Sequence, residues 1–547
     1  MCLHPQPVND IPEQTVEIAK AAFPKGNIYM QMRDELGTFY EDEDFAELFP
    51  TRGQSAMSPW RLALITIMQF AENLTDRQAA DAVRGRIDWK YALNLELTDP
   101  GFHYSVLSEF RQRLVENDLQ EVLLDRMLET FQGRGWLKAR GRQRTDSTHV
   151  LAAIRTLNRL ELVGETMRYA LNTLAEVAPE WLKLQLQPGW VDRYSDRVDN
   201  YRLPTQKKER DQLARTIGLD GYRLLYKLHD EATPLGLHEL EAIETLRQVW
   251  KQQYILKNGD ICWRETSELP PSATRIASPY EQEARYSRKR ETEWVGYKVH
   301  LTETCDDDMP NLIIHVETTP ATQQDIDVVE DIHTDIADKN LSPAQHIVDM
   351  AYVSSDVLAS SHDQHQIELL GPVRADVSWQ AHTEGAFDIS CFTIDWDAKT
   401  VTCPMGNTNR RWREGTGKFG KPNVVVTFDL ADCRSCSAHA RCTRSQKRGL
   451  TFPQEAEYKA LQAARQLQMT EAFKGDYRKR AGIEGTISQA AYALGGRQAR
   501  YRGEAKSHLQ HVATAAAINI TRGVNWVLGK PKAQTRSSCF ATLAAGF

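Results

Sequence analysis

Two acidic residues lie in or just after short predicted strands, where they could share a metal ion. Asp146 lies in the β-rich stretch 144–151, and Asp349 follows the apolar stretch that begins at Gln345. If the two stretches are neighbouring strands of an open α/β sheet, both carboxylates emerge at one edge of the sheet, where such folds bind ligands. An Asp after a strand is commonly only a turn former, so neither residue indicates a site by itself.

A third carboxylate, Glu484, lies in a basic segment with helical spacing. Tyr477, Arg480 and Glu484 stand at i, i+3 and i+7, which places them on one stripe of a helix. On this stripe Glu484 can complete a metal site while Tyr477 and Arg480 face a phosphate. The alternative is a surface ion pair between Arg480 and Glu484, worth roughly a few tenths of a kcal/mol. We favour the functional interpretation because further basic residues follow in a glycine-flanked segment, namely Arg497, Arg500, Arg502 and Lys506.

Four of the nine cysteines fall in one short window and have spacing typical of zinc ligands. Cys433 and Cys436 form a C-x2-C knuckle, and Cys403 and Cys442 could complete a Cys₄ tetrahedron, with His439 as an alternative fourth ligand. Four protein ligands leave no open position, so such a zinc would be structural. The alternative is a set of free thiols in a small core, since the gap between Cys403 and Cys433 is long. Among nearby arginines, Trp412 either stacks on an unpaired base or, as we favour, packs in a core.

The composition indicates a multidomain globular protein of the cytoplasm. A chain of 547 residues is expected to form two to four domains, and 41% hydrophobic with 26% charged residues is ordinary for folded proteins. The net charge of -7 argues only weakly against nucleic acid, because the basic residues concentrate between 474 and 506. Neither a signal peptide nor a run of about 18 apolar residues occurs, which predicts a soluble protein without a membrane partner. The clustered cysteines favour metal binding in a reducing compartment over disulfides.

The order of the predicted elements indicates the fold class. A strand around Asp146 is followed by a long helical stretch, two antiparallel strands at 296–302 and 311–317, and then helix, strand, helix, strand. This order resembles the ribonuclease H topology, a mixed sheet with helices. Residues 56–135 are strongly helical, with a capping box at Thr75–Gln78 and a stop at Gly85. This helical unit is either a plain bundle or a helix-turn-helix-like DNA-binding domain.

These patterns predict an α/β protein with an all-α N-terminal domain. We expect an irregular acidic segment at 1–55, a helical and DNA-binding domain at 56–137, a ribonuclease H-like catalytic domain at 138–528 with a helical insertion at 152–290 and a cysteine-bearing insertion at 380–455, and a basic tail at 529–547.

Three motifs together resemble the signatures of DDE transposases from bacterial insertion sequences. They are Tyr477-x2-Arg480-x3-Glu484, Thr145-Asp146-Ser147-Thr148 and Val348-Asp349-x2-Tyr352. Residues 278–285 and 296–298 are similar to the approach to the family's second strand, and residues 60–114 to its helical N-terminal domain. The resemblance covers about 55–525. In two places the chain departs from the family pattern: Ala491 stands where a Lys or Arg is common, and Glu281 where Asp is common.

The resemblance implies a metal-dependent enzyme that cuts and joins DNA. Asp146, Asp349 and Glu484 would hold two Mg²⁺ or Mn²⁺ ions, with Asp146 bridging both, because hard oxygen ligands suit these ions. Arg497 or Arg500 would replace the missing phosphate contact at 491. Water would attack at the transposon end, and the freed 3′-OH would then attack target DNA. The implied partners are the element's terminal inverted repeats and target DNA in the nucleoid, bound by a dimer or larger assembly.

Two other functions remain open at this stage. One is a ribonuclease H-like nuclease that cuts without strand transfer. The other is a non-catalytic zinc-ribbon protein that binds DNA.

Overall fold

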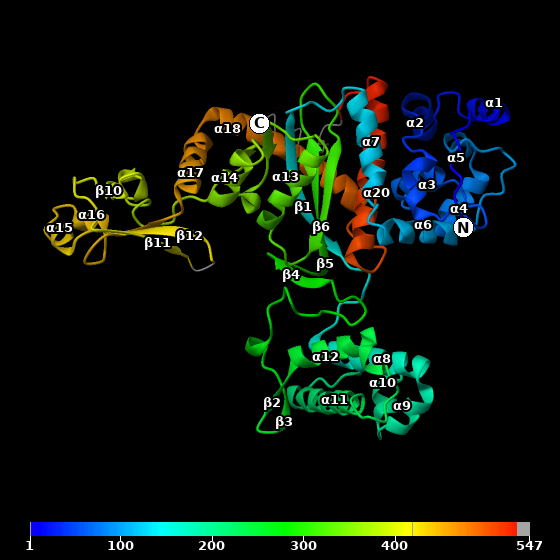
Figure 1. Ribbon diagram of the computed structural model, residues 1–547, viewed down its shortest axis with the longest axis horizontal. Helices are drawn as coiled ribbons and strands as arrows, with labels where there is room; N and C mark the ends of the chain where they lie inside the picture. The colour runs from blue at the N-terminus through cyan, green and yellow to red at the C-terminus, as the bar shows by residue number, and fades with distance from the viewer. Residues whose placement is uncertain (1, 418–419, 533–547) are drawn as a thin grey trace, which may run out of the picture.

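The computed structural model describes residues 2–417 and 420–532 (Figure 1). At its centre lies a six-stranded sheet whose main order is β6, β5, β1, β7, β8, with β4 also paired to β5. Its strands are β1 (Arg142–Leu151), β4 (Arg285–Lys289), β5 (Thr292–Thr304), β6 (Ile313–Pro320), β7 (Gln345–Ile347) and β8 (Glu368–Leu370).

The strand directions agree with the fold class that the sequence predicts. Strand β5 runs antiparallel to both β1 and β6, whereas β1, β7 and β8 are parallel. Three antiparallel strands continued by two parallel ones are consistent with a ribonuclease H-like fold. The expected hairpin at 296–302 and 311–317 is present as β5 and β6, and each is longer than expected at one end or both.

The cross-strand register decides which side chains share a face of the sheet. Thr148 pairs with Val299, which pairs with Thr318, and the Thr318 hydroxyl lies 2.8 Å from Nδ1 of His511 in α20 (Glu504–Val527). Since side chains alternate along a strand, Asp146 shares the α20 face with Thr148. The opposite face is covered by α13 (Val329–Asp338), which packs on β6.

The N-terminal part of the chain is helical from residue 13 onward. Its elements are α1 (Glu13–Ala22), α2 (Ile28–Leu36), η1 (Asp42–Leu48), α3 (Pro59–Ala71), α4 (Asp76–Gly85), α5 (Ile87–Ala92), α6 (Ser105–Glu116) and α7 (Val122–Gly133). The capping box predicted at Thr75 and the helix end at Gly85 are confirmed. Helices α3 and α7 pack on α20, so this unit shares one core with the sheet.

The sequence predicted an irregular segment at 1–55, and this prediction is wrong. The segment contributes three helical elements. Tyr40 and Phe45 are fully buried in the shared core, and Tyr40 donates a 2.5 Å hydrogen bond to the Leu123 carbonyl. Helices of nine or ten residues show little periodicity, and tertiary packing stabilises them here. This is why the polar composition gave no helical signal.

The helical insertion forms a separate lobe with its own core, drawn below the sheet in Figure 1. It contains α8 (Arg159–Val177), α9 (Pro179–Gln185), α10 (Trp190–Tyr194), η2 (Asn200–Arg202), α11 (Lys207–Lys227), η3 (Leu237–Glu239), α12 (Glu241–Gln253), β2 (Tyr254–Lys257), β3 (Asp260–Trp263) and η4 (Thr266–Glu268).

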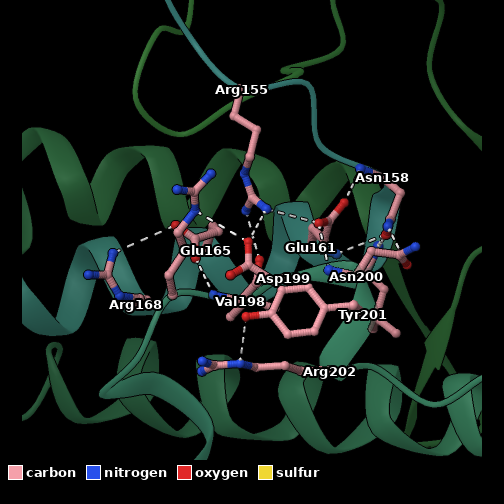
Figure 2. A network of polar contacts seen from close by, with 12 residues as sticks. Arg155, Asn158, Glu161, Glu165, Arg168, Val198, Asp199, Asn200, Tyr201 and Arg202 are labelled. Atoms are coloured by element: carbon pink, nitrogen blue, oxygen red, sulfur yellow. Dashed lines mark hydrogen bonds and ion pairs between the residues drawn. The ribbon is translucent and has the colours of Figure 1, made fainter.

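A polar network fixes the entry to this lobe, as Figure 2 shows. Arg155 donates to Asp199 at 2.6 Å and to Glu161 of α8 at 3.1 Å. Glu165, one turn further along α8, accepts from the Val198 backbone N–H at 2.5 Å. The loop at 198–200 is therefore tied to α8.

The cysteine-bearing insertion is a second small lobe, at the left of Figure 1. It contains η7 (Ile389–Cys391), β9 (Thr393–Asp395), β10 (Thr400–Thr402), β11 (Arg411–Thr416), β12 (Pro422–Thr427), α15 (Leu430–Arg434), α16 (His439–Cys442) and β13 (Gly449–Phe452). Trp412 packs edge-on against Trp396 with 5.6 Å between ring centroids, so the expectation of core packing is confirmed.

Helices then lead back to the sheet. They are α17 (Glu455–Gln468), α18 (Glu471–Tyr477), η8 (Arg478–Arg480), α19 (Ala481–Ser488) and the π-helical η9 (Gln489–Ala493), while η5 (Asp325–Val328), η6 (Met350–Tyr352) and α14 (Ser355–Asp363) complete the α/β domain. No helix in residues 2–417 or 420–532 is long and apolar enough to cross a membrane. From residue 533 on, the predicted basic tail lies outside the described residues.

Candidate active site

Two of the predicted carboxylates come from adjacent parallel strands. Asp146 lies within β1, and Asp349 follows β7 by two residues and caps η6, accepting the Ala351 N–H at 2.7 Å. Burial raises the pKa of Asp146, and the nearby negative charge of Asp349 adds to this effect, while Arg480 opposes it. The expected meeting of the two carboxylates at one sheet edge is thus present.

Arg480 joins the third carboxylate to the first. Its Nη2 donates to Asp146 Oδ2 at 2.7 Å, and its Nη1 donates to Glu484 Oε1 at 3.1 Å. The Arg480 and Asp146 side chains are only 16% and 14% exposed, whereas Glu484 is 64% exposed. The anticipated surface ion pair between Arg480 and Glu484 therefore exists, but the same guanidinium also connects α19 to strand β1.

Tyr477 lies near the same three carboxylates, one helical turn before Arg480 in the chain. Burial raises the pKa of its phenol, and all three carboxylates, Asp349, Asp146 and Glu484, raise it further. A short 3-10 segment, η8, separates Tyr477 from α19, so the predicted stripe is not one continuous α-helix. The stripe nevertheless brings Tyr477, Arg480 and Glu484 to the two strand carboxylates.

The three carboxylates are suited to hold hard divalent cations such as Mg²⁺ or Mn²⁺ by their chemistry, since all the donors are oxygens. The three carboxylates do not form a compact cluster, because the Arg480 guanidinium lies between Asp146 and Glu484. Within the described part of the chain, the only group of three or more His, Cys, Asp or Glu side chains with ligand atoms within 4.8 Å of one another is His315, Glu317 and Asp335. A cation at the predicted site would therefore have to replace the guanidinium.

A buried ion network, which the sequence interpretation missed, holds the Glu484 helix against the sheet. Glu303 of β5 is fully buried and accepts from Arg144 of β1, from Arg522 of α20 and from the Thr486 hydroxyl of α19, at 2.6–2.7 Å. Burial opposes its ionisation, yet the two arginines and Thr486 hold the pKa of Glu303 below its usual value. The only sign of this ion network in the sequence was an arginine in a predicted strand, two residues before Asp146.

The other face of the sheet supports the first strand. Tyr352 is fully buried, and its hydroxyl lies 2.7 Å from Nδ1 of His300. His300 of β5 pairs with Ser147, the neighbour of Asp146 in β1, and burial raises the pKa of the Tyr352 phenol. Tyr352 of the Asp349 motif is thus packed behind Asp146.

The structure separates the other four basic residues, besides Arg480, that were predicted to contact DNA. Arg497 donates to the Thr148 hydroxyl at 3.1 Å and to the His149 ring, and it lies over the ring of Tyr492. Arg500 donates to the Leu74 carbonyl at 2.7 Å and to Asn73, so it joins the α20 region to the helical unit. Arg502 is exposed and Lys506 is partly exposed.

Ala491, where the related sequences often carry a Lys or Arg, is only 4% exposed. It lies in the π-helical segment η9, and a long basic side chain there would be buried. The departure from the family pattern therefore has a structural reason.

The four predicted zinc ligands line one pocket. Cys403, Cys433, Cys436 and Cys442 surround it together with His439. Burial raises the pKa of Cys442, and the other three sulfurs add to the effect. The sulfurs are not within 4.8 Å of one another as a group, so the ligands share a pocket without a closed tetrahedron.

A ribonuclease H-like sheet with carboxylates gathered at its edge is typical of enzymes that cut nucleic-acid backbones with metal ions. Residues 402–524, which include Arg480 and Glu484, match the family model described as a transposase DDE domain. Residues 17–113 match the model described as a transposase domain (DUF772), which includes helices from the segment 1–55. These two matches, in separate parts of the chain, support an insertion-sequence DDE transposase. No curated protein and no solved structure matches it.

Proposed function

We propose that this protein binds the terminal inverted repeats of its element, cleaves the DNA there by metal-assisted hydrolysis and joins the freed 3′-OH ends to target DNA. The observation that carries the proposal is that Arg480 links Asp146 to Glu484 beside Asp349. The carboxylates come from segments more than a hundred residues apart, and no structural need of the fold requires three of them at one sheet edge.

In this proposal Asp146, Asp349 and Glu484 would hold two Mg²⁺ or Mn²⁺ ions, which would supply activation of the nucleophile and neutralisation of the charge on the phosphate. Asp146 would be shared by the two ions, because it lies next to Asp349 and is joined to Glu484 through Arg480. Arg480 would leave the carboxylates when cations and DNA bind, and its guanidinium would then donate to two oxygens of one phosphate. Tyr477 lies beside it and contributes a phenol hydrogen bond to the same backbone.

The remaining parts of the proposal concern assembly. The helical unit that includes residues 56–137 binds the terminal repeat, and pairing of two ends requires a dimer or larger complex on DNA. Cys403, Cys433, Cys436 and Cys442 bind one structural Zn²⁺, since they line a single pocket. The protein acts in the cytoplasm on nucleoid DNA.

The test is cleavage of a duplex that carries the terminal repeat, with Mg²⁺, by the wild type and by Asp146→Asn. The variant should lose cleavage and keep DNA binding. Asp338→Asn, an exposed carboxylate of α13, is the matched control and should cleave normally. Cleavage by Asp146→Asn at the wild-type rate would refute the role assigned to Asp146. A wild type that binds DNA but does not cleave it would favour a non-catalytic zinc-ribbon protein.

A second assay separates a transposase from a nuclease. Pre-cleaved ends with a free 3′-OH are incubated with the wild type, Mg²⁺ and a supercoiled target. Joined products are expected, and their absence under conditions where cleavage proceeds would favour the nuclease.

A further inference from the structure

Helix α11 of the insertion lobe has one face without a partner. Its inner face is fixed by Gly218 and Gly221, where a Cβ would lie 2.6 Å from the Tyr254 ring and 2.2 Å from the Trp250 ring. These close contacts set the rotation of the helix about its axis. Six exposed residues then form one outer stripe with steps of three or four, namely Lys208, Gln212, Arg215, Leu219, Arg223 and Tyr226.

The stripe is positively charged and is not neutralised locally. Lys208, Arg215 and Arg223 make no ion pair and no side-chain hydrogen bond with any described residue. Asp220, on the inner side of the same helix, is held by Arg193 at 2.7 Å and by the Tyr194 hydroxyl at 2.8 Å. Its charge is thus already compensated inside the lobe.

The stripe ends in a hollow that offers hydrogen-bond donors. The hollow is lined by Arg223, Tyr226 and Lys227 of α11, together with Trp190, Gln185 and Gln187. Trp190 is 2% exposed, and its indole N–H has no hydrogen-bond partner in the structure. An indole N–H only donates, and no carboxylate lines the hollow, so its chemistry suits an anionic ligand with several oxygens.

We propose that the outer stripe of α11 and this hollow bind the phosphate backbone of duplex DNA, as a second DNA contact besides the candidate active site. The inference rests on the proposed function. At a rise of about 1.5 Å per residue, Lys208 and Arg223 lie about 22 Å apart along the helix. This distance corresponds to roughly six base pairs of a DNA strand, so the charges fit an extended polyanion better than a small phosphate.

The position of the lobe suggests what the second DNA contact does. The lobe is inserted between β1, which carries Asp146, and β4, and Figure 1 shows it set apart from the sheet. DNA held at the candidate active site and continuing past the sheet would meet the lobe outside the cleaved bond. The contact would therefore bind sequence-independently and position the DNA that flanks the cleavage point.

The experiment compares Arg215→Gln/Arg223→Gln with Lys183→Gln/Lys251→Gln in the full chain. Both double variants remove two exposed positive charges from the same lobe, but the control residues lie on α9 and α12. Affinity for a mixed-sequence duplex of about 40 base pairs is measured by fluorescence anisotropy over a series of salt concentrations. Loss of two phosphate contacts should lower the slope of log K against log salt by about 2 and weaken binding about 10- to 100-fold at low salt. The control variant should match the wild type.

Trp190→Phe tests the hollow separately. It removes a neutral donor and keeps the aromatic ring, so it should weaken binding several-fold without changing the salt slope. Wild-type affinity in this variant would overturn the role of the hollow.

Two outcomes would overturn the proposal that the stripe binds DNA. One is a salt slope of Arg215→Gln/Arg223→Gln equal to that of its control. The other is a change in sedimentation of the DNA-free protein with unchanged DNA affinity, which would make the stripe a protein interface. If the wild type itself neither binds nor cleaves duplex DNA, the proposed function fails, whereas an unaffected double variant of an active enzyme refutes only this inference.

Discussion

Replacing Arg480 should change metal binding and DNA cleavage in opposite directions. In the structure its guanidinium forms ion pairs with the carboxylates of Asp146 and Glu484, so a cation must displace it before binding there. The contact with Asp146 is a charge-assisted hydrogen bond between two largely buried side chains, worth about 1.5–3 kcal/mol. The contact with Glu484 is exposed and adds only about 0.3–0.5 kcal/mol.

Arg480→Gln removes this competition, and the DNA-free variant should bind Mn²⁺ about 10- to 100-fold more tightly than the wild type, since about 1.4 kcal/mol corresponds to a factor of ten. Cleavage of DNA should nevertheless slow, because the variant lacks the guanidinium that binds the phosphate. Mn²⁺ affinity is measured by electron paramagnetic resonance titration, and cleavage under single-turnover conditions.

Arg478→Gln is the matched control, because Arg478 is an exposed neighbour of like charge. It changes the net charge equally but should leave Mn²⁺ affinity near the wild-type value. If Arg480→Gln binds Mn²⁺ no more tightly than this control does, the guanidinium does not compete with cations and the reasoning is wrong.

Three further perturbations test the supporting structure. Glu303→Gln leaves the buried Arg144 and the half-buried Arg522 without their counter-charge and should destabilise the catalytic domain by about 3–5 kcal/mol in urea denaturation, whereas an unchanged midpoint would show that the network is dispensable. Burial would lower the pKa of His508, but its 2.6 Å hydrogen bond to Glu121 raises it, so the stabilisation is complete below the ordinary pKa of about 6.5 and is lost as the pH rises through the folded value. The protection of α7 and α20 against hydrogen exchange, corrected for the intrinsic exchange rate at each pH, should therefore fall between neutral and alkaline pH in the wild type and not in His508→Gln, and equal pH profiles of protection would contradict the account. Cys433→Ser should abolish a bound zinc detected by plasma mass spectrometry, while Cys262→Ser, outside the cysteine pocket, should retain it; zinc absent from the wild type would remove the metal from the proposal.

The sheet was largely predictable because its signals are local. Alternating or continuous apolar runs marked β1, β5, β6 and β7, and their order with the intervening helices restricted the topology. Short helices between 13 and 48 escaped prediction, since burial of residues such as Tyr40 and Phe45 depends on partners far along the chain.

The proximity of the candidate site residues was predictable, but their contacts were not. Three motifs located Asp146, Asp349 and Glu484 by type and spacing, and the structure brings them to one place. That Arg480 bridges two of them, and that Arg500 binds the carbonyl of Leu74 instead of facing solvent, depends on long-range packing. Sequence spacing carries no information on such contacts, and the buried Glu303 network was missed for the same reason.

The claim that three carboxylates hold a pair of divalent ions is tested most directly by anomalous diffraction from crystals of the protein with a cleaved DNA end and Mn²⁺. The account predicts two manganese peaks about 3.5–4 Å apart between Asp146, Asp349 and Glu484, with Arg480 moved onto a phosphate. Manganese found only elsewhere, for example at His315, Glu317 and Asp335, with Arg480 still joining Asp146 to Glu484, would contradict it.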